Sequence, residues 1–162
     1  MATVIKIGMA DLRVTKAPDN ILQTCGLGSC VGICLWDTVT RVAGMAHIML
    51  PDSKQSKSQG NKAKFADTAV PVLIEMMINI GANKNRLVAK IAGGAQMFSF
   101  YGKNDIMRIG ERNTEAVKSA LQKEKIRILA QDTGGNYGRT IEFSADSGQL
   151  LIKTINVGES VI

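Results

Sequence analysis

The hydrophobic pattern of the chain consists mainly of short apolar and β-branched runs separated by turn-forming residues. Such runs predict strands over residues 3–7, 12–15, 31–36, 42–50, 87–92, 126–130, 141–145 and 149–155. Apolar residues at helical spacing predict two helices, from about residue 66 to Gly81 and from about Asn113 to Lys125. Strands dominate and do not alternate regularly with helices. We therefore expect an α+β fold, with a β-sandwich or layered-sheet core flanked by helices.

The composition is that of an ordinary globular protein, with 45% hydrophobic and 21% charged residues. A length of 162 residues corresponds to one domain, which we expect to span residues 1–162. No apolar run is long enough for a transmembrane helix, so membrane insertion is not expected. The first ten residues lack the long apolar segment of a secretion signal. We expect a cytoplasmic protein.

The net charge of +6 raises the question of an acidic partner. Aromatic residues, which stack on bases in nucleic-acid-binding proteins, make up only 4% of the chain, and most basic residues are spread singly. One segment, residues 54–64, gathers four lysines among Ser, Gln and Gly. A solvated loop is the first interpretation of this segment, and a docking surface for an acidic protein is the second. Nucleic acid is not expected as a partner.

The chain contains a single histidine, His47, and three cysteines, Cys25, Cys30 and Cys34. Any chemistry that needs an imidazole must therefore use His47. Disulfides are not expected in a cytosolic protein, and the C-x4-C-x3-C spacing lacks the paired ligands of structural zinc sites. Cys25 and Cys34 fit the positions of small buried hydrophobic residues. Cys30 is the better candidate nucleophile.

A hairpin between residues 31–36 and 42–50 can bring Cys30 directly opposite His47. Side chains that face each other across two strands lie close enough for a thiol and an imidazole to meet. The same histidine, isolated in an apolar strand, is also compatible with an ordinary core residue. No Asp or Glu stands out as the group that orients the imidazole. A hydroxyl or a backbone carbonyl near Thr24 is a candidate for that role.

The glycines that precede Cys30 support its assignment. Gly26 and Gly28 allow the tight backbone in which N–H groups become available to a substrate. In acyl transfer two such groups beside the nucleophile form an oxyanion hole. The N–H groups of Ser29 and Cys30 are the candidates here.

At these residues the chain resembles CheD, the family of bacterial chemoreceptor glutamine deamidases. The matching segments follow the family's order and spacing. They are GLGSCV at 26–31, GMAHIMLP at 44–51, KFADTA at 64–69 and GGAQMF at 93–98. The resemblance covers nearly the whole chain, and the Gly-Ser-Cys and Ala-His segments together are its most specific part.

The resemblance implies a fold similar to the catalytic domain of the cytotoxic necrotizing factor toxins, and the conversion of chemoreceptor glutamines to glutamate. It gives Cys30 the role of nucleophile, His47 that of base and Thr24 that of the orienting group. This chemistry requires no metal or organic cofactor. The implied partners are the helical cytoplasmic region of chemoreceptors and the phosphatase CheC.

Substrate contacts are expected at the rim of the site, formed by residues 54–64 and 93–100. Gly28 and Gly94 would keep the rim shallow. Phe98 and Phe100 are candidate anchors for a partner helix, although their alternation also fits a buried strand. The alternative function is a binding regulator that docks and stimulates a CheC-type phosphatase, with deamidation secondary or absent.

Overall fold

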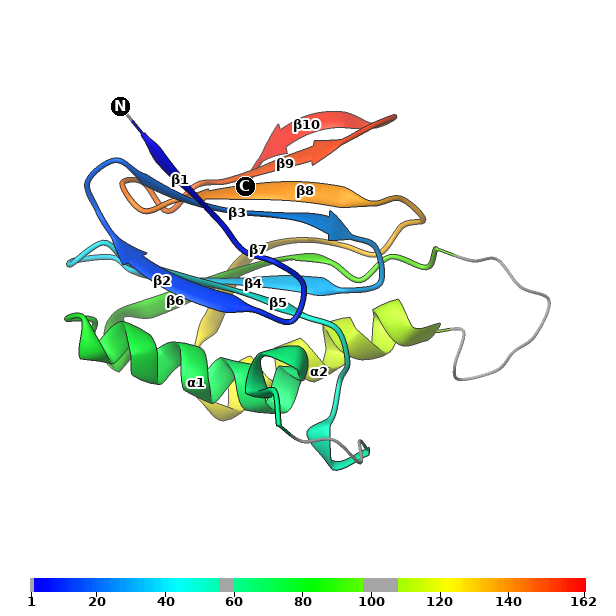
Figure 1. The fold of residues 1–162 in the computed structure, drawn as a ribbon, viewed down its shortest axis with the longest axis horizontal. Coiled ribbons are helices and arrows are strands. Elements are labelled where there is room, and N and C mark those ends of the chain that lie inside the picture. The colour runs from blue at the N-terminus through cyan, green and yellow to red at the C-terminus, as the bar shows by residue number, and fades with distance from the viewer. Residues whose placement is uncertain (1, 56–59, 98–107) are drawn as a thin grey trace.

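The computed structural model describes residues 2–55, 60–97 and 108–162, whose strands form two five-stranded sheets packed face to face (Figure 1). Sheet A has the strand order β1-β3-β8-β9-β10, and sheet B has the order β2-β5-β4-β6-β7. The strands are β1 (Thr3–Lys6), β2 (Leu12–Lys16), β3 (Asn20–Leu27), β4 (Val31–Asp37), β5 (Val42–Ile48), β6 (Leu87–Gly93), β7 (Arg127–Thr133), β8 (Arg139–Ser144), β9 (Leu150–Thr154) and β10 (Gly158–Val161).

Two helices, α1 (Ala66–Asn79) and α2 (Ile109–Lys123), cover the outer face of sheet B (Figure 1). Three short 3-10 turns complete the described elements: η1 (Ser53–Gln55), η2 (Lys62–Lys64) and η3 (Lys84–Arg86). The layers are thus sheet, sheet and helices. The expected α+β class with a layered-sheet core flanked by helices is confirmed. No helix within the described ranges is long and apolar enough to cross a membrane.

The central strands β4 and β5 separate two apolar cores. Because side chains alternate along a strand, Val31 and Ile33 of β4 pack against the helices, whereas Cys34 lies between the sheets. On β5, Met45 and His47 share the inter-sheet side with Cys34. Every residue of β5 is buried, which explains why this strand has an almost continuous apolar sequence.

The register expected for the β4–β5 hairpin is wrong by two residues, because Gly32, not Cys30, pairs with His47. The turn causes the shift. The carboxylate of Asp37 accepts hydrogen bonds from two backbone N–H groups of the turn, and Arg41 adopts a φ of 58°. Residues 38–41 therefore belong to the turn. Since side chains alternate with a period of two, this shift leaves Cys30 on the same face as His47.

Other parts of the topology were not apparent in the hydrophobic pattern. β3 occupies a stretch for which no strand is expected, and it pairs with β1 in parallel and with β8 antiparallel. β10 is exposed at every position and therefore carries no apolar alternation. β6 and β7 are parallel neighbours, joined by a crossover through α2.

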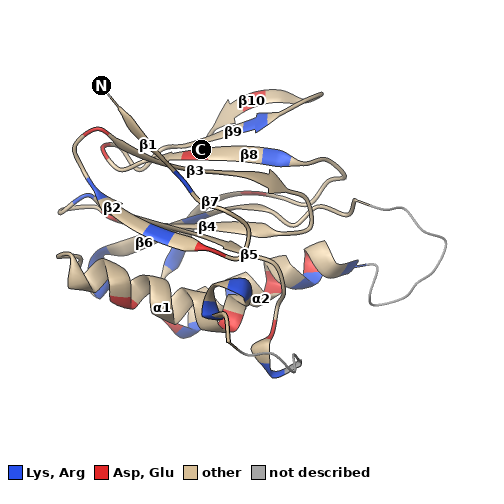
Figure 2. Cartoon of the chain, viewed as in Figure 1, with Lys and Arg blue, Asp and Glu red and all other residues tan. Residues whose placement is uncertain are grey.

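Basic and acidic residues are interspersed over both helices and several strands (Figure 2). Four residues of the lysine-containing segment 54–64, residues 56–59, lie outside the described residues. Its described C-terminal part, η2, lies against the first turns of α1, where Thr68 hydrogen-bonds to the carbonyl of Lys62. A docking role for this segment stays a prediction.

Candidate active site

A buried hydrogen-bond chain joins the two sheets at Thr24 and His47. The Thr24 hydroxyl donates to the carbonyl of Ile7 at 2.8 Å and lies 2.7 Å from Nδ1 of His47. Because the hydroxyl has a single proton and donates it to Ile7, it must accept a hydrogen bond from the N–H at Nδ1 of His47. His47 is thereby held with its proton on Nδ1, which leaves the lone pair of Nε2 free. Two backbone bonds fix β5 at the same position: the N–H of His47 donates to the carbonyl of Asp11, and the carbonyl of His47 accepts from the N–H of Ala10.

The free Nε2 of His47 lies on the side of the sheet that carries Cys30. This nitrogen is buried and makes no hydrogen bond within the described residues. Cys30 precedes β4 by one residue, is 7% exposed, and belongs to the inter-sheet core. It is the diagonal neighbour of His47 on that face, separated from it along β4 by Gly32, which has no side chain to intervene. Cys30 and His47 therefore lie on the same face of the sheet at diagonally adjacent positions, and the glycine beside them, Gly32, has no side chain to separate them.

Burial keeps both groups neutral at rest. It raises the pKa of the Cys30 thiol above its ordinary value of 9.0, against the opposing effect of the residue's own backbone N–H. It lowers the pKa of His47 below 6.5. Near pH 7 the resting pair is therefore a thiol and a neutral imidazole. Such an imidazole can accept the thiol proton.

The loop between β3 and β4 is held by its carbonyl groups. The carbonyl of Gly28 accepts from the N–H of Ala95, and that of Cys30 accepts from the N–H of Gly94, both at 2.8 Å. Gly94 has a φ of 66°, and a β-carbon on it would collide with the side chain of Thr114. Only glycine therefore permits this approach. The N–H groups of Ser29 and Cys30 bind no oxygen within the described residues.

Asn113 of α2 supplies the bond to the remaining carbonyl of this loop. Its side-chain amide donates to the carbonyl of Ser29 at 3.0 Å and to that of Met49 at 2.9 Å. The residue is fully buried in the second turn of the helix. Sequence reasoning missed it, because the helix begins at Ile109 and not at about Asn113 as predicted, and an asparagine at the start of a predicted helix gives no sign of contacts that are distant in the chain.

The remaining candidates have different outcomes. Gly28 lies under the side chain of Met97, which a β-carbon at Gly28 would meet at 3.1 Å. Cys34 is buried as expected, but Cys25 is exposed, which corrects its assignment as a buried residue. The reason is alternation: Thr24 points inward from β3, so Cys25 points outward from a sheet face that no described helix covers. Phe98 and Phe100 lie outside the described residues.

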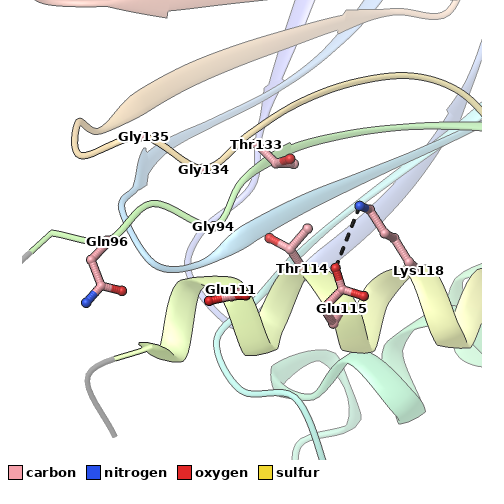
Figure 3. Close-up of a pocket in the computed structure, with 9 residues that line it drawn as sticks. All are labelled: Gly94, Gln96, Glu111, Thr114, Glu115, Lys118, Thr133, Gly134 and Gly135. Atoms are coloured by element: carbon pink, nitrogen blue, oxygen red, sulfur yellow. Dashed lines mark ion pairs between the residues drawn. The ribbon is translucent and has the colours of Figure 1, made fainter. Parts of the chain in front are cut away.

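A cavity of about 320 Å³ lies beside the Cys30 loop, between α2 and the segments that follow β6 and β7 (Figure 3). Gly94 contributes to its wall, and Thr114, Glu115 and Lys118 line it from α2. Glu115 and Lys118 form an ion pair at 3.8 Å across one helical turn. Cys30 itself does not line this cavity.

Comparison with known proteins gives a solved structure and many relatives. The solved structure is that of a Bacillus licheniformis hypothetical protein named YfiH, which aligns with a TM-score of 0.45 and 15% sequence identity. The alignment covers 75% of this chain and 51% of that protein. Of the relatives, a probable chemoreceptor glutamine deamidase CheD from Syntrophomonas wolfei is 55% identical over 100% of both chains. Another from Caldanaerobacter subterraneus is 57% identical over 98% of each.

A third relative, the chemoreceptor glutamine deamidase CheD of Halalkalibacterium halodurans, is 56% identical over 100% of both chains. The family model described as CheD chemotactic sensory transduction matches residues 49–154. The match covers more than half of the chain, and the relatives are similar over its full length. The chain therefore belongs to the CheD family.

Proposed function

We propose that this protein is a cytoplasmic deamidase that converts glutamine side chains of chemoreceptors to glutamate. The observation that carries the proposal is the hydrogen-bond chain from Ile7 through Thr24 to Nδ1 of His47, because it leaves Nε2 available as a base on the face of Cys30. The names of the relatives supply the substrate class.

In the proposed reaction, His47 Nε2 takes the thiol proton of Cys30, and the thiolate attacks the glutamine amide carbon. The amide oxygen becomes an oxyanion, for which the N–H groups of Ser29 and Cys30 are the proposed donors. The C–N bond then breaks, and ammonia leaves with the proton carried by His47. A water molecule activated by the same imidazole hydrolyses the thioester. This step gives glutamate and restores the thiol.

Thr24 has a double role in this scheme. Before the reaction it selects the tautomer in which Nε2 is unprotonated. Once Nε2 has taken the thiol proton, both ring nitrogens carry a proton, and the hydroxyl accepts a charge-assisted hydrogen bond from Nδ1. The threonine therefore stabilises the charged imidazolium more than the neutral ring. An oriented hydroxyl performs here the task for which other enzymes use a carboxylate.

For the partners, we propose the helical cytoplasmic region of chemoreceptors as substrate and a CheC-type phosphatase as a second binding protein. Gly28 and Gly94 border the Cys30 loop and are the proposed points of close approach. Because binding does not need the thiol, a Cys30→Ala protein should still bind the phosphatase. Loss of that binding in Cys30→Ala would contradict the proposed independence of the two activities.

The function is tested by incubating the protein with a receptor cytoplasmic fragment and, separately, with free glutamine. We expect ammonia release from the fragment, and tandem mass spectrometry should locate glutamate at a former glutamine. Free glutamine should release little ammonia, since the site is proposed to recognise a protein surface. Absence of conversion in the fragments of every receptor class tested would refute the function. Appearance of amine adducts in place of glutamate would indicate a transamidase.

A further inference from the structure

The central β4–β5 ladder ends just before the residues proposed to perform the chemistry. Its last pair is Val31 with Ile48, so Ser29 and Cys30 lie beyond the strand pairing. A loop with no ladder bonds is free to turn its peptide groups unless other donors hold them. The orientation of the Ser29–Cys30 peptide thus depends on contacts outside the sheet.

Each of the three consecutive carbonyl groups in this loop has one donor from elsewhere in the chain. Backbone N–H groups bind the first and the third, those of Gly28 and Cys30. The middle carbonyl, that of Ser29, is bound by the side chain of Asn113. It has no other donor among the residues that the structure describes. The middle peptide therefore depends on a single side chain.

In a planar trans peptide the carbonyl and the following N–H point in opposite directions. The bond from Asn113 to the Ser29 carbonyl pulls that oxygen toward α2, and so turns the Cys30 N–H away from α2. Consistent with this orientation, the residue's own backbone N–H partly opposes the rise that burial causes in the pKa of the Cys30 thiol. An N–H turned toward that sulfur is a suitable donor for the oxyanion that forms when the sulfur attacks.

The second bond of Asn113 extends the same constraint to the segment that carries His47. Its amide also donates to the carbonyl of Met49, two residues after His47. One planar group therefore sets the separation of the two loop segments at the point where the ladder ends. Both N–H donors are used, while Oδ1 is buried with no donor in the described part of the chain. A buried amide that leaves its own acceptor unsatisfied is retained at a cost, which points to a role for its donors.

We propose that Asn113 is a positioning residue, which fixes the Ser29–Cys30 peptide so that the Cys30 N–H faces the developing oxyanion. The kinetic test of this proposal, described below, depends on the proposed deamidase function, whereas the structural test does not.

Two substitutions remove the donors with little change in size. Asn113→Leu keeps the branched shape and has no polar group, and Asn113→Val is a second apolar side chain that has no hydrogen to donate. If one variant fails to fold, the other serves. Leu121→Ala is the matched control, because Leu121 is fully buried on the same helix and contacts the helix-side core, away from the Cys30 loop. It lowers Tm by leaving a cavity.

With a receptor fragment as substrate, the Asn113 variants should lose kcat roughly 10²-fold, the loss typical when one oxyanion donor is removed, with KM unchanged. Leu121→Ala should retain the wild-type kcat well below its Tm. A kcat loss in the Asn113 variants no greater than in Leu121→Ala would overturn the proposal. A raised KM with the wild-type kcat would also overturn it.

A crystal structure of either Asn113 variant decides the point without any activity. The Ser29 carbonyl should turn away from α2, taking the Cys30 N–H with it. A peptide that keeps its wild-type orientation would overturn the proposal. Failure of the wild-type protein to deamidate any receptor fragment would refute the proposed function, whereas the crystal structure would still decide the role of Asn113.

Discussion

Replacing Thr24 with valine tests the orientation of His47 while keeping the shape of the side chain. The change removes the hydroxyl that accepts from Nδ1 at 2.7 Å and donates to the carbonyl of Ile7 at 2.8 Å. Thr24 is the hydrogen-bond partner of Nδ1 within the described part of the chain, so in the variant we expect the ring to be free to carry its proton on Nε2. That tautomer cannot act as a base toward Cys30.

The expected size of the effect follows from the charge that develops on the ring. A hydrogen bond to a charged group contributes about 1.5–3 kcal/mol. Since about 1.4 kcal/mol corresponds to a tenfold change in rate, losing the bond from the imidazolium should lower kcat by roughly 10- to 150-fold. KM should change little, because Thr24 is 2% exposed and does not reach the surface that a receptor contacts.

The assay is ammonia release from a receptor fragment, measured well below the Tm of each variant. Thr24→Ser should retain most of kcat, because it keeps the hydroxyl. Thr15→Val, at a buried threonine of β2 paired with Ala43 at the far end of β5, should behave like the wild type. A Thr24→Val protein with the wild-type kcat would refute the orienting role. An equal loss of kcat in Thr15→Val would also contradict the orienting role, because it would show that removing any buried hydroxyl lowers the activity.

Three further predictions concern pH, stability and the exposed thiol. Because the pKa of His47 lies below 6.5 and that of Cys30 above 9.0, kcat/KM should be constant between these pH values and should fall on the acidic side only below pH 6.5. A tenfold rise of kcat/KM between pH 7 and 8 would contradict this prediction, because it would show that the rate follows the fraction of Cys30 present as thiolate. Burial alone would raise the pKa of Asp37, but its ion pair with Arg86 and three backbone N–H donors hold this pKa well below 3.8. Asp37→Asn should therefore lower the free energy of unfolding by about 3 kcal/mol at neutral pH, and denaturant titration should show this difference shrinking as the pH falls below 3.8. The control Glu115→Gln, at an exposed ion pair, should lower the free energy of unfolding by less than about 1 kcal/mol, and an equal effect of the two substitutions would contradict the argument. Cys25 should react with a thiol reagent faster than the buried cysteines in peptide mapping, and Cys25→Ala should keep full deamidase activity; slower labelling of Cys25 would contradict its exposure.

The sequence pattern was sufficient for the layered α+β class, because apolar runs and helical spacing report burial directly. It was insufficient for the β4–β5 register, which depends on how Asp37 folds the turn through backbone hydrogen bonds. The Cys–His placement tolerated this error, since a two-residue shift preserves the face of a strand. A one-residue error would have separated Cys30 from His47.

Contacts between distant segments were beyond the reach of local patterns. The role of Thr24 was implied by family resemblance, whereas its hydrogen bond crosses from one sheet to the other. Asn113 binds carbonyl groups 84 and 64 residues away in the chain. Such bonds exist only once the helix packs on the sheet.

The central claim is that the thiol of Cys30, and no other, performs the deamidation. Its most direct test is intact-mass analysis of one receptor fragment after incubation with wild-type, Cys30→Ala or Cys34→Ala protein. Cys34 is the matched control, since it lies on the same face of the sheet as Cys30 and is fully buried. We predict that the fragment acquires the mass of glutamate in place of glutamine with wild-type and Cys34→Ala protein, and is unchanged with Cys30→Ala. Conversion of the fragment by pure Cys30→Ala protein would contradict the account.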